Sequence, residues 1–244
     1  MKILYIGMKY DYGEKARGLS FEHYNFYDSL VKMDHGQHEV IYFPVDEEIT
    51  AKGRAGANAA LIDTVKDLSP DLCFFFLFQD EILPETIQKI TNSGVITYNW
   101  FADDHFRFDD FSRHYAPCFS FSSTTDSLAI AKYQKIGCRN VLKTQWGCNH
   151  FLYKPAEGTN FKHNVSFVGQ PHGNRKKVIS YLKSQDVTTD CFGLGWPHGR
   201  IAQEEMIAIF GQSRINLNLT KASGGLALKD LGKIFLTKKN GQLK

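Results

Sequence analysis

Short apolar runs alternate with longer amphipathic segments from the first residue onward. The runs have the length of buried strands, and the segments between them repeat apolar residues with the helical period. This alternation predicts an α/β fold, in which a parallel sheet carries helices on both faces. Within residues 1–150 the expected strands are 2–7, 39–43, 71–78, 95–100, 118–122 and 140–144, and the expected helices are 21–33, 57–68, 84–92 and 127–135.

The alternation breaks between residues 149 and 162, where Pro155, Gly158 and polar residues predict a linker. It restarts with strands expected at 164–168, 188–192, 215–219 and, more weakly patterned, 232–237, and with helices at 174–184 and 203–210. We therefore expect two Rossmann-like domains that face a cleft, residues 1–150 and an incomplete second domain, 163–244. A small sheet with an exposed edge predicts that the second domain packs either on the first domain or on another chain, as in a homo-oligomer that covers it.

Composition and charge narrow the class of protein. The chain has 244 residues, of which 43% are hydrophobic, and its net charge of +3 is spread along its length. This balance predicts no nucleic-acid partner. Five cysteines without a CxxC pair indicate a reducing compartment. The first residues read as a strand rather than a secretion signal, and the longest apolar run is too short to cross a bilayer, so we expect a cytoplasmic protein without a transmembrane segment.

A glycine-containing turn with a basic helix start follows the strand expected at 164–168. It holds Gly169, Gly173 and Arg175. Backbone N–H groups in such a turn and the positive end of the helix suit an anion. The turn predicts a site for a phosphorylated ligand, most simply a nucleotide.

Two more strand ends carry glycine and a cation. They read Phe192-Gly-Leu-Gly-Trp-Pro-His-Gly-Arg200 and Lys221-Ala-Ser-Gly-Gly225. Glycine permits close backbone approach, and Trp196 offers a face for a flat ring. Three such turns at one edge of a sheet favour a shared ligand site. The alternative is that loops of α/β folds prefer glycine for conformational reasons alone.

Several of these segments resemble one family. Ser166-Phe-Val-Gly-Gln170, the run from Phe192 to Arg200, and Ser213-Arg-Ile-Asn-Leu-Asn-Leu219 are similar to the CgeB-type (spore-protein-like) glycosyltransferases, as are Trp100-Phe-Ala-Asp-Asp104 and the residues around Asn149. That family resembles the larger GT-B group, whose members have two facing Rossmann-like domains. The similarity covers residues 95–220, and residues before it match only in general pattern.

The resemblance implies a glycosyltransferase that moves a sugar from a nucleoside-diphosphate sugar to a hydroxyl acceptor without a metal or another cofactor. The second domain would bind the donor, through Gly169, Gln170, Gly173, Arg175, Gly193, Gly195, Trp196, Arg200 and Lys229. Residues after 219 lack the Glu-x-Pro segment of the family. A non-catalytic nucleotide- or sugar-binding module therefore stays open as the alternative.

The first domain offers candidates for the base and the acceptor site. Asp103, Asp104 and His105 follow a predicted strand, where a carboxylate or histidine can take the proton of an attacking hydroxyl, and Asp104 is the first choice. Alternatively, Asp103 caps a helix or turn.

The loop after the first strand lacks the G-x-G-x-x-G spacing of a dinucleotide site. It would border the acceptor through Tyr10, Tyr12, Gly13 and Arg17, unless it is merely an exposed loop. Histidine spacing predicts no metal site.

Overall fold

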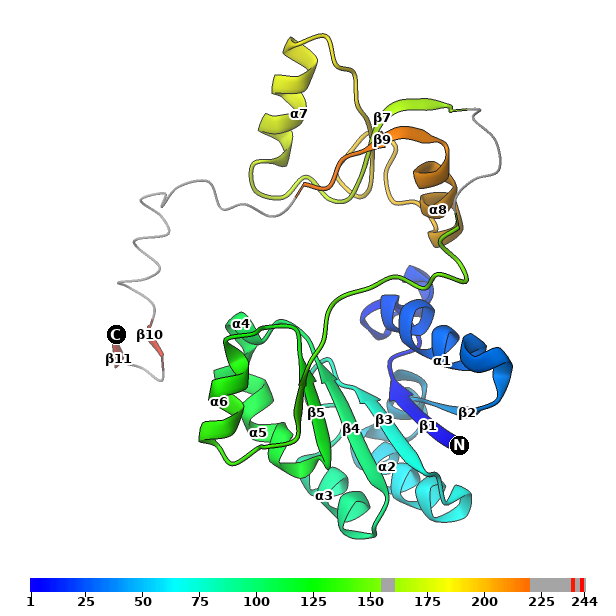
Figure 1. Cartoon of the computed structure of the whole chain (residues 1–244), viewed down its shortest axis with the longest axis vertical. Helices are drawn as coiled ribbons and strands as arrows, with labels where there is room; N and C mark the ends of the chain where they lie inside the picture. The colour runs from blue at the N-terminus through cyan, green and yellow to red at the C-terminus, as the bar shows by residue number, and fades with distance from the viewer. Residues whose placement is uncertain (155–160, 220–237, 240–241, 244) are drawn as a thin grey trace. The chain divides into compact units, whose positions relative to one another are not determined.

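The computed structural model describes residues 1–154, 161–219, 238–239 and 242–243 (Figure 1). The chain divides into two compact units, Met1–Phe151 and Leu152–Lys244, called unit 1 and unit 2 below. In the described part of the chain, no helix combines the length and the apolar character needed to cross a membrane. The strand expected at 232–237, the turn at 221–225 and Lys229 lie outside the described residues.

Unit 1 is built on a six-stranded parallel sheet with the order β2-β1-β3-β4-β5-β6. The order reverses between β1 and β3, so connections leave this pair of strands toward opposite edges of the sheet. In open α/β sheets such a switch point is where ligands bind, at the carboxyl ends of the strands. The strands are β1 (Lys2–Gly7), β2 (Glu39–Pro44), β3 (Leu72–Phe76), β4 (Ile96–Phe101), β5 (Phe121–Thr124) and β6 (Val141–Lys143).

Helices connect these strands, mostly where the sequence predicts them. The helix expected at 57–68 begins earlier, at Val45, and is interrupted at Gly53, whose φ is +69°. The helix expected at 21–33 is a helical segment in which a π-helical stretch, His23–Tyr27, leads into α1 (Asp28–Lys32). The others are α2 (Val45–Leu68), α3 (Pro84–Asn92), α4 (Asp104–Arg107), α5 (Arg113–Tyr115) and α6 (Ala129–Lys135), with short 3-10 or π turns at Asp11–Gly13, Lys15–Arg17, Met33–Gly36, Phe108–Ser112 and Ala116–Cys118.

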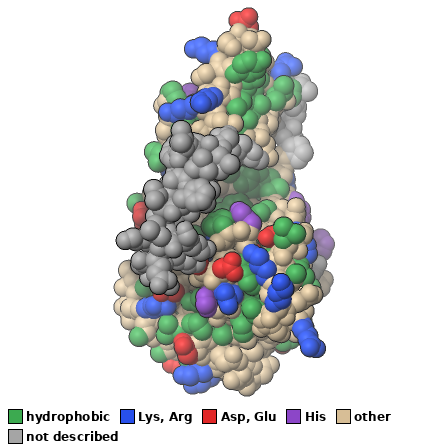
Figure 2. Space-filling view, turned by 90° about the vertical axis from the view of Figure 1, so that its left-hand side faces the viewer, with side chains coloured by type: hydrophobic (Ala, Val, Ile, Leu, Met, Phe, Trp, Pro, Cys, Tyr) green, Lys and Arg blue, Asp and Glu red, His purple; other side chains and the backbone are tan. Residues whose placement is uncertain are grey.

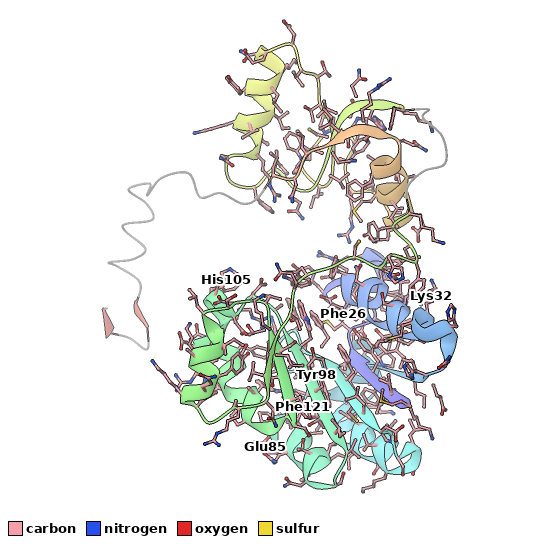
Figure 3. The ribbon with its side chains drawn as sticks, in the orientation of Figure 1. Phe26, Lys32, Glu85, Tyr98, His105 and Phe121 are labelled. Carbon is pink, nitrogen blue, oxygen red and sulfur yellow. The ribbon has the colours of Figure 1, made fainter. Side chains whose placement is uncertain are left out.

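Alternation along each strand divides the apolar side chains of unit 1 between two cores. Leu4 and Ile6 join the larger core under α2, α3 and α6, whereas Tyr5 joins a smaller aromatic core on the other face. In this second core Phe26, labelled in Figure 3, packs with its ring centroid 5.0 Å from those of Phe76 and Trp100. The helical segment at 21–36 therefore covers the face above β3 and β4 near their carboxyl ends.

The residues after β6 return to this helical segment. The side chain of Asn149 is buried, and its Nδ2 donates to Tyr24 O at 2.7 Å and to Asp28 Oδ2 at 2.7 Å. Trp146 packs edge-on against Trp100, with ring centroids 4.5 Å apart. These contacts fix the last residues of unit 1 against the aromatic core.

Unit 2 repeats the architecture on a smaller scale. Its three-stranded parallel sheet has the order β8-β7-β9, and the order again reverses at the first strand of the unit. The elements are β7 (His163–Val168), α7 (Arg175–Ser184), β8 (Asp190–Phe192), α8 (Gln203–Gly211) and β9 (Ser213–Asn216), with a separate antiparallel pair, β10 (Lys238–Lys239) and β11 (Gln242–Leu243). The predicted α/β class with parallel sheets is confirmed.

Candidate functional site

In unit 2, the turns that follow β7 and β8 are joined into one structure. Gly169 N–H donates to Phe192 O at 2.8 Å, and Trp196 Nε1–H donates to Gly169 O at 2.8 Å. The second turn is closed on itself by the bond from Gly193 N–H to Gly199 O, 2.7 Å long. Of the residues predicted for the donor site, the structure therefore brings Gly169, Gly193 and Trp196 together. We call this assembly of residues 169–175 and 193–200 the paired turns.

Glycine is required where the paired turns touch. A Cβ atom on Gly193 would lie 2.7 Å from the carbonyl oxygen of Gly169, and one on Gly195 would lie 2.9 Å from Pro171 Cγ. Both glycines have positive φ, +125° and +93°. Side chains at either position would force the turns apart. The spacing of glycines in the sequence thus reflects a close approach of two backbone segments.

Arg175 ties the paired turns to the third strand. Its Nε–H donates to Leu219 O at 2.9 Å, beyond the end of β9, and an NH1 hydrogen donates to Gln170 O at 2.8 Å. The guanidinium also lies over the Phe167 ring, 5.4 Å from its centroid. Arg175 therefore holds the carboxyl ends of β7 and β9 in register, besides placing a positive charge there.

Helix α7 begins directly at the paired turns. Gly173 has a φ of +61°, and Asn174 stands at the N-cap without a side-chain capping bond in the described structure. Lys176 and Lys177 follow as exposed cations. Gln170 and Arg200 are also exposed at this end of the sheet. The first turn of α7 thus places two kinds of positive charge beside the glycine turns, the positive end of the helix dipole and the lysine side chains.

Unit 1 has a pocket at its own switch point. It has a volume of about 200 Å³ and lies beyond the carboxyl ends of β1 and β3. Its walls are mainly aromatic, with two acidic side chains. We call it the Glu22 pocket, and it is lined by Met8, Tyr10, Asp11, Tyr12, Phe21, Glu22, Phe76 and Phe78.

The loop that forms one wall of the Glu22 pocket is anchored by backbone bonds. The buried carboxylate of Asp46, in the first turn of α2, accepts from Lys9 N–H and Tyr10 N–H, both at 2.9 Å. Ser20 Oγ donates to Met8 O at 2.8 Å and accepts from His23 N–H at 3.0 Å, which caps the helical segment. This wall is therefore preorganised by Asp46 and Ser20.

Phe78 on the opposite wall is fixed in the same way. Its backbone N–H donates to Glu81 Oε1 at 3.1 Å, and its carbonyl oxygen accepts from the Arg107 guanidinium. The Phe78 ring meets Tyr12 edge-on, with centroids 5.3 Å apart and planes at 87°. Two perpendicular aromatic rings thus form a corner of the pocket.

Glu22 supplies the pocket with a carboxyl group in an apolar setting. Burial raises the pKa of the Glu22 carboxyl, and polar interactions with its own backbone N–H and with the Ser20 side chain offset only part of this effect. A carboxyl group with a raised pKa in a pocket is a candidate general base. Glu22 also borders a neighbouring open hollow together with Phe21, Trp146 and Gly147.

Two of the four residues predicted for the acceptor side line this pocket. Tyr10 and Tyr12 line it. Arg17 lies behind the wall, where its guanidinium covers Tyr12 at 4.6 Å from the ring centroid and its Nε–H donates to Asp11 at 2.9 Å. Gly13 shapes the loop with a φ of +72° and does not line the pocket in the described structure.

Asp104 does not have the placement that a catalytic base needs. Its side chain is fully buried at 0% exposure, and its two carboxylate oxygens accept from Ser112 Oγ at 2.6 Å and from Tyr133 OH at 2.8 Å. The prediction that Asp104 faces a ligand is therefore wrong. The carboxylate joins α4 to the π turn at 108–112 and to α6, because its position in the first turn of α4 points it into the core.

Asp103 and His105 flank Asp104 with different environments. Asp103 is half-buried, has a φ of +61° and stands at the N-cap of α4, but its side chain makes no capping bond in the described structure. His105 is exposed on α4 (Figure 3). It packs against Phe106, with ring centroids 4.7 Å apart. Neither lines the Glu22 pocket. A catalytic role for Asp103 or His105 stays a prediction.

The surface around α4 and α6 carries charges of both signs. Figure 2 views unit 1 from this side and shows Lys, Arg, Asp and Glu side chains intermixed with apolar ones. Within the described residues, no group of three His, Cys, Asp or Glu side chains has the arrangement of a metal site. That the protein acts without a metal stays a prediction.

Glu22, Phe76 and Phe78 are site residues that the sequence patterns do not identify. Phe76 and Phe78 belong to an apolar run that reads as strand core, and Glu22 stands in the first turn of an amphipathic helix, where acidic residues are common for dipole reasons. The available signal was the position of Glu22 directly after the glycine-rich loop that follows the first strand. That position places it at the carboxyl end of β1.

Comparison with known proteins gives a remote structural likeness. No protein-family model matches the chain, and no curated protein is similar to it in sequence. Among solved structures, the chain is similar to a UDP-GlcNAc 2-epimerase from Neisseria meningitidis, with 10% identity, a TM-score of 0.49 and coverage of 88% of this chain and 77% of that one. It is also similar to the lipopolysaccharide outer core galactosyltransferase WaaB, with 14% identity, a TM-score of 0.42 and coverage of 89% and 68%.

A third similar structure is the glycosyltransferase SnogD from Streptomyces nogalater. It shares 14% identity at a TM-score of 0.36, with coverage of 91% of this chain and 74% of that one. Likeness at this level says nothing of which ligand this chain binds. The CgeB-type resemblance of the sequence stays a prediction.

The close approach of the paired turns predicts unequal effects of two alanine substitutions. Gly193→Ala would place a methyl group 2.7 Å from Gly169 O, whereas Gly199→Ala, also at positive φ, meets nothing within 4 Å. Overpacking of this kind costs about 1–3 kcal/mol. We expect Gly193→Ala to lower the free energy of unfolding by about that much more than Gly199→Ala, measured by urea denaturation followed by circular dichroism. Equal losses would contradict the contact.

Because the Asp104 carboxylate is buried and hydrogen-bonded, replacing it should lower the stability of the protein. Asp104→Ala leaves two buried hydroxyls, on Ser112 and Tyr133, without their acceptor, which costs about 1–3 kcal/mol in unfolding free energy. The control is Asp109→Ala, at an exposed position nearby, which should change stability by less than about 0.5 kcal/mol. Denaturant unfolding of both variants measures the difference, and an Asp104→Ala protein as stable as the control would refute this role.

Proposed function

We propose that the protein transfers a sugar from a nucleoside-diphosphate sugar to a hydroxyl acceptor. In this proposal unit 2 binds the donor at the paired turns, and unit 1 binds the acceptor in the Glu22 pocket. The observation that carries the proposal is the convergence of the β7 turn, the β8 turn and the start of α7 at one end of the sheet. The CgeB-like motifs of the sequence fall on these same segments.

The chemistry of the paired turns suits a diphosphate. Backbone N–H groups of glycine turns and of the first helical turn can donate to phosphate oxygens, and the helix dipole favours negative charge there. Lys176 and Lys177 add mobile cations at the same helix end. When the bond between the sugar and the diphosphate breaks, negative charge grows on the diphosphate, so preorganised donors at this point stabilise the leaving group.

Arg175 has two roles in this proposal, one structural and one electrostatic. Two of its N–H groups are committed to the carbonyl oxygens of Gln170 and Leu219, so it orders the turns that would surround the diphosphate. Its charge adds to that of Lys176 and Lys177. Gly193, Gly195 and Trp196 complete the donor side, and Trp196 is held by its bond to Gly169 O.

Glu22 is the proposed general base. The oxygen of the acceptor hydroxyl attacks the anomeric carbon of the sugar and forms the new glycosidic bond. The bond between that carbon and the diphosphate oxygen breaks, and the nucleoside diphosphate leaves with the bonding electrons. The hydroxyl proton passes to the Glu22 carboxylate and then to water, so charge and atoms balance without a further reactant.

Nucleotide binding tests the donor site. Arg175→Ala should weaken the binding of UDP, GDP or dTDP, whichever binds, by about 1–3 kcal/mol, because a charge-assisted and turn-ordering partner is lost. Lys183→Ala, which removes an equal charge from the last turn of the same helix, is the control and should leave binding unchanged. Isothermal titration calorimetry measures both. An unaltered dissociation constant in Arg175→Ala would refute the assignment of the paired turns.

The proposed activity is tested directly with a panel of UDP-, GDP- and dTDP-sugars and hydroxyl acceptors, by measuring nucleotide release and the glycosylated product. Acceptor-dependent release supports a transferase. Tight nucleotide binding without release under any combination would instead identify a binding module.

Glu22 predicts a pH dependence. A base acts only when ionised, and burial raises the pKa of Glu22, so turnover should rise with pH through a value above that of an ordinary glutamate, about 4.3. Glu22→Gln should reduce kcat by about 10²–10⁴-fold and leave the nucleotide dissociation constant unchanged. Glu14→Gln, at an exposed position of the same loop, should retain both the rate and the pH profile. A Glu22→Gln enzyme with the wild-type profile would exclude this base.

A further inference from the structure

The walls of the Glu22 pocket differ from those expected for a polar acceptor. We propose that the acceptor bound there is a small, uncharged aromatic alcohol, a phenol or naphthol, rather than a sugar. This inference rests on the proposed function for the fate of the hydroxyl, but it concerns binding in the pocket and is testable without a donor.

The first argument is the geometry of the aromatic side chains. Tyr12 and Phe78 meet at 87° with centroids 5.3 Å apart, so a flat ring lying parallel to one of them meets the other edge-on. Both arrangements are favourable for aromatic pairs. Arg17 covers part of the Tyr12 ring, yet Tyr12 is still 61% exposed, which leaves ring surface for a ligand.

The base of the pocket is also aromatic and is held from behind. Phe76 is stacked on Trp100 at 5.4 Å with planes at 19°, and the Phe26 ring lies 5.0 Å from Phe76 (Figure 3). A rigid aromatic wall loses little entropy when a ring binds against it. Together with the fixed backbone of Phe78, it presents a preformed surface for a flat molecule.

The second argument is size. The pocket has a volume of about 200 Å³. An apolar cavity of about 150 Å³ accommodates benzene. One aromatic ring or two fused rings therefore match the space.

The third argument is the shortage of polar partners. Among the described lining residues, the polar side chains are those of Asp11, Glu22 and the two tyrosines, and Asp11 already accepts from Arg17 at 2.9 Å. A sugar carries hydroxyls around its ring, and each one buried without a partner is costly. The two carboxyl groups disfavour a further negative charge, which counts against anionic acceptors. A neutral ring with one hydroxyl needs one polar partner, and Glu22 provides it.

The position of Glu22 also leaves the bound hydroxyl accessible. Glu22 and Phe21 border a second, open hollow of about 520 Å³, lined further by Trp146 and Gly147. A hydroxyl directed at Glu22 from the aromatic pocket thus has room beside it for a second reactant. The ring itself stays against Tyr12 and Phe78.

The test is direct binding to the full chain without nucleotide, measured by calorimetry and saturation-transfer NMR with naphthol, naphthoate and N-acetylglucosamine as probes. We expect naphthol to bind at least about tenfold more tightly than either of the others. Tyr12→Ala should weaken naphthol binding about twofold to tenfold, because one ring contact is lost. Tyr181→Ala, at an exposed tyrosine of α7 in unit 2, is the matched control and should bind as the unmodified chain does.

Two further variants separate this inference from the proposed function. Phe78→Ala should weaken naphthol binding as Tyr12→Ala does. Glu22→Gln should bind naphthol within about twofold of the unmodified chain, because the amide oxygen still accepts the hydroxyl, while any turnover falls by about 10²–10⁴-fold. The inference is overturned if N-acetylglucosamine or naphthoate binds as tightly as naphthol, or if neither Tyr12→Ala nor Phe78→Ala changes naphthol binding. If naphthol binds but no donor releases its nucleotide, the inference about the pocket stands and the proposed transferase activity is refuted.

Discussion

Both parallel sheets of this protein reverse their strand order at their first strand, and the rest of the site geometry depends on that reversal. In unit 1 the connections from β1 and β3 leave toward opposite edges, and in unit 2 the first strand, β7, lies between β8 and β9. No helix can cover the carboxyl ends of a strand pair whose connections diverge. The Glu22 pocket and the paired turns both lie at such ends. The two candidate sites are thus consequences of topology, and the side chains decide what each can bind.

At both sites, polar side chains hold backbone in place before they are available for a ligand. Asp46 accepts two N–H groups of the loop beside the Glu22 pocket, and Glu81 and Arg107 hold the backbone of Phe78. Arg175 and Trp196 bond to carbonyl oxygens of the paired turns. Irregular segments lack the ladder bonds of helices and strands, so side chains satisfy their buried backbone groups instead. A charged residue in a ligand-binding loop therefore often has an architectural part that the sequence does not reveal.

Periodicity made the sheets predictable, and tertiary contacts account for where the predictions failed. Alternation along β1 separates Leu4 and Ile6 from Tyr5, and this pattern is visible in the sequence. The apolar run that predicts a strand at 71–78 gives no sign that β3 ends at Phe76. The next N–H group, that of Leu77, donates to a side chain of the neighbouring strand β4, Asn99 Oδ1 at 3.3 Å, and not to a backbone carbonyl. The sequence places Asp104 correctly after β4. It does not reveal that the Tyr133 hydroxyl of α6 donates a hydrogen bond to the Asp104 carboxylate, because the two residues are distant in the chain.

Asp104 and Glu22 are both shielded carboxyl groups, but their surroundings differ. Asp104 is fully buried, yet both its oxygens accept hydroxyl protons, so the charged form has partners that hold it in one orientation. Glu22 lies among aromatic rings, where burial outweighs the bonds that favour its charged form and its pKa rises. A hydroxyl that enters the pocket would donate a further hydrogen bond to this carboxylate. The apolar surroundings that select a flat ring are therefore the same ones that make the carboxylate a stronger base toward it.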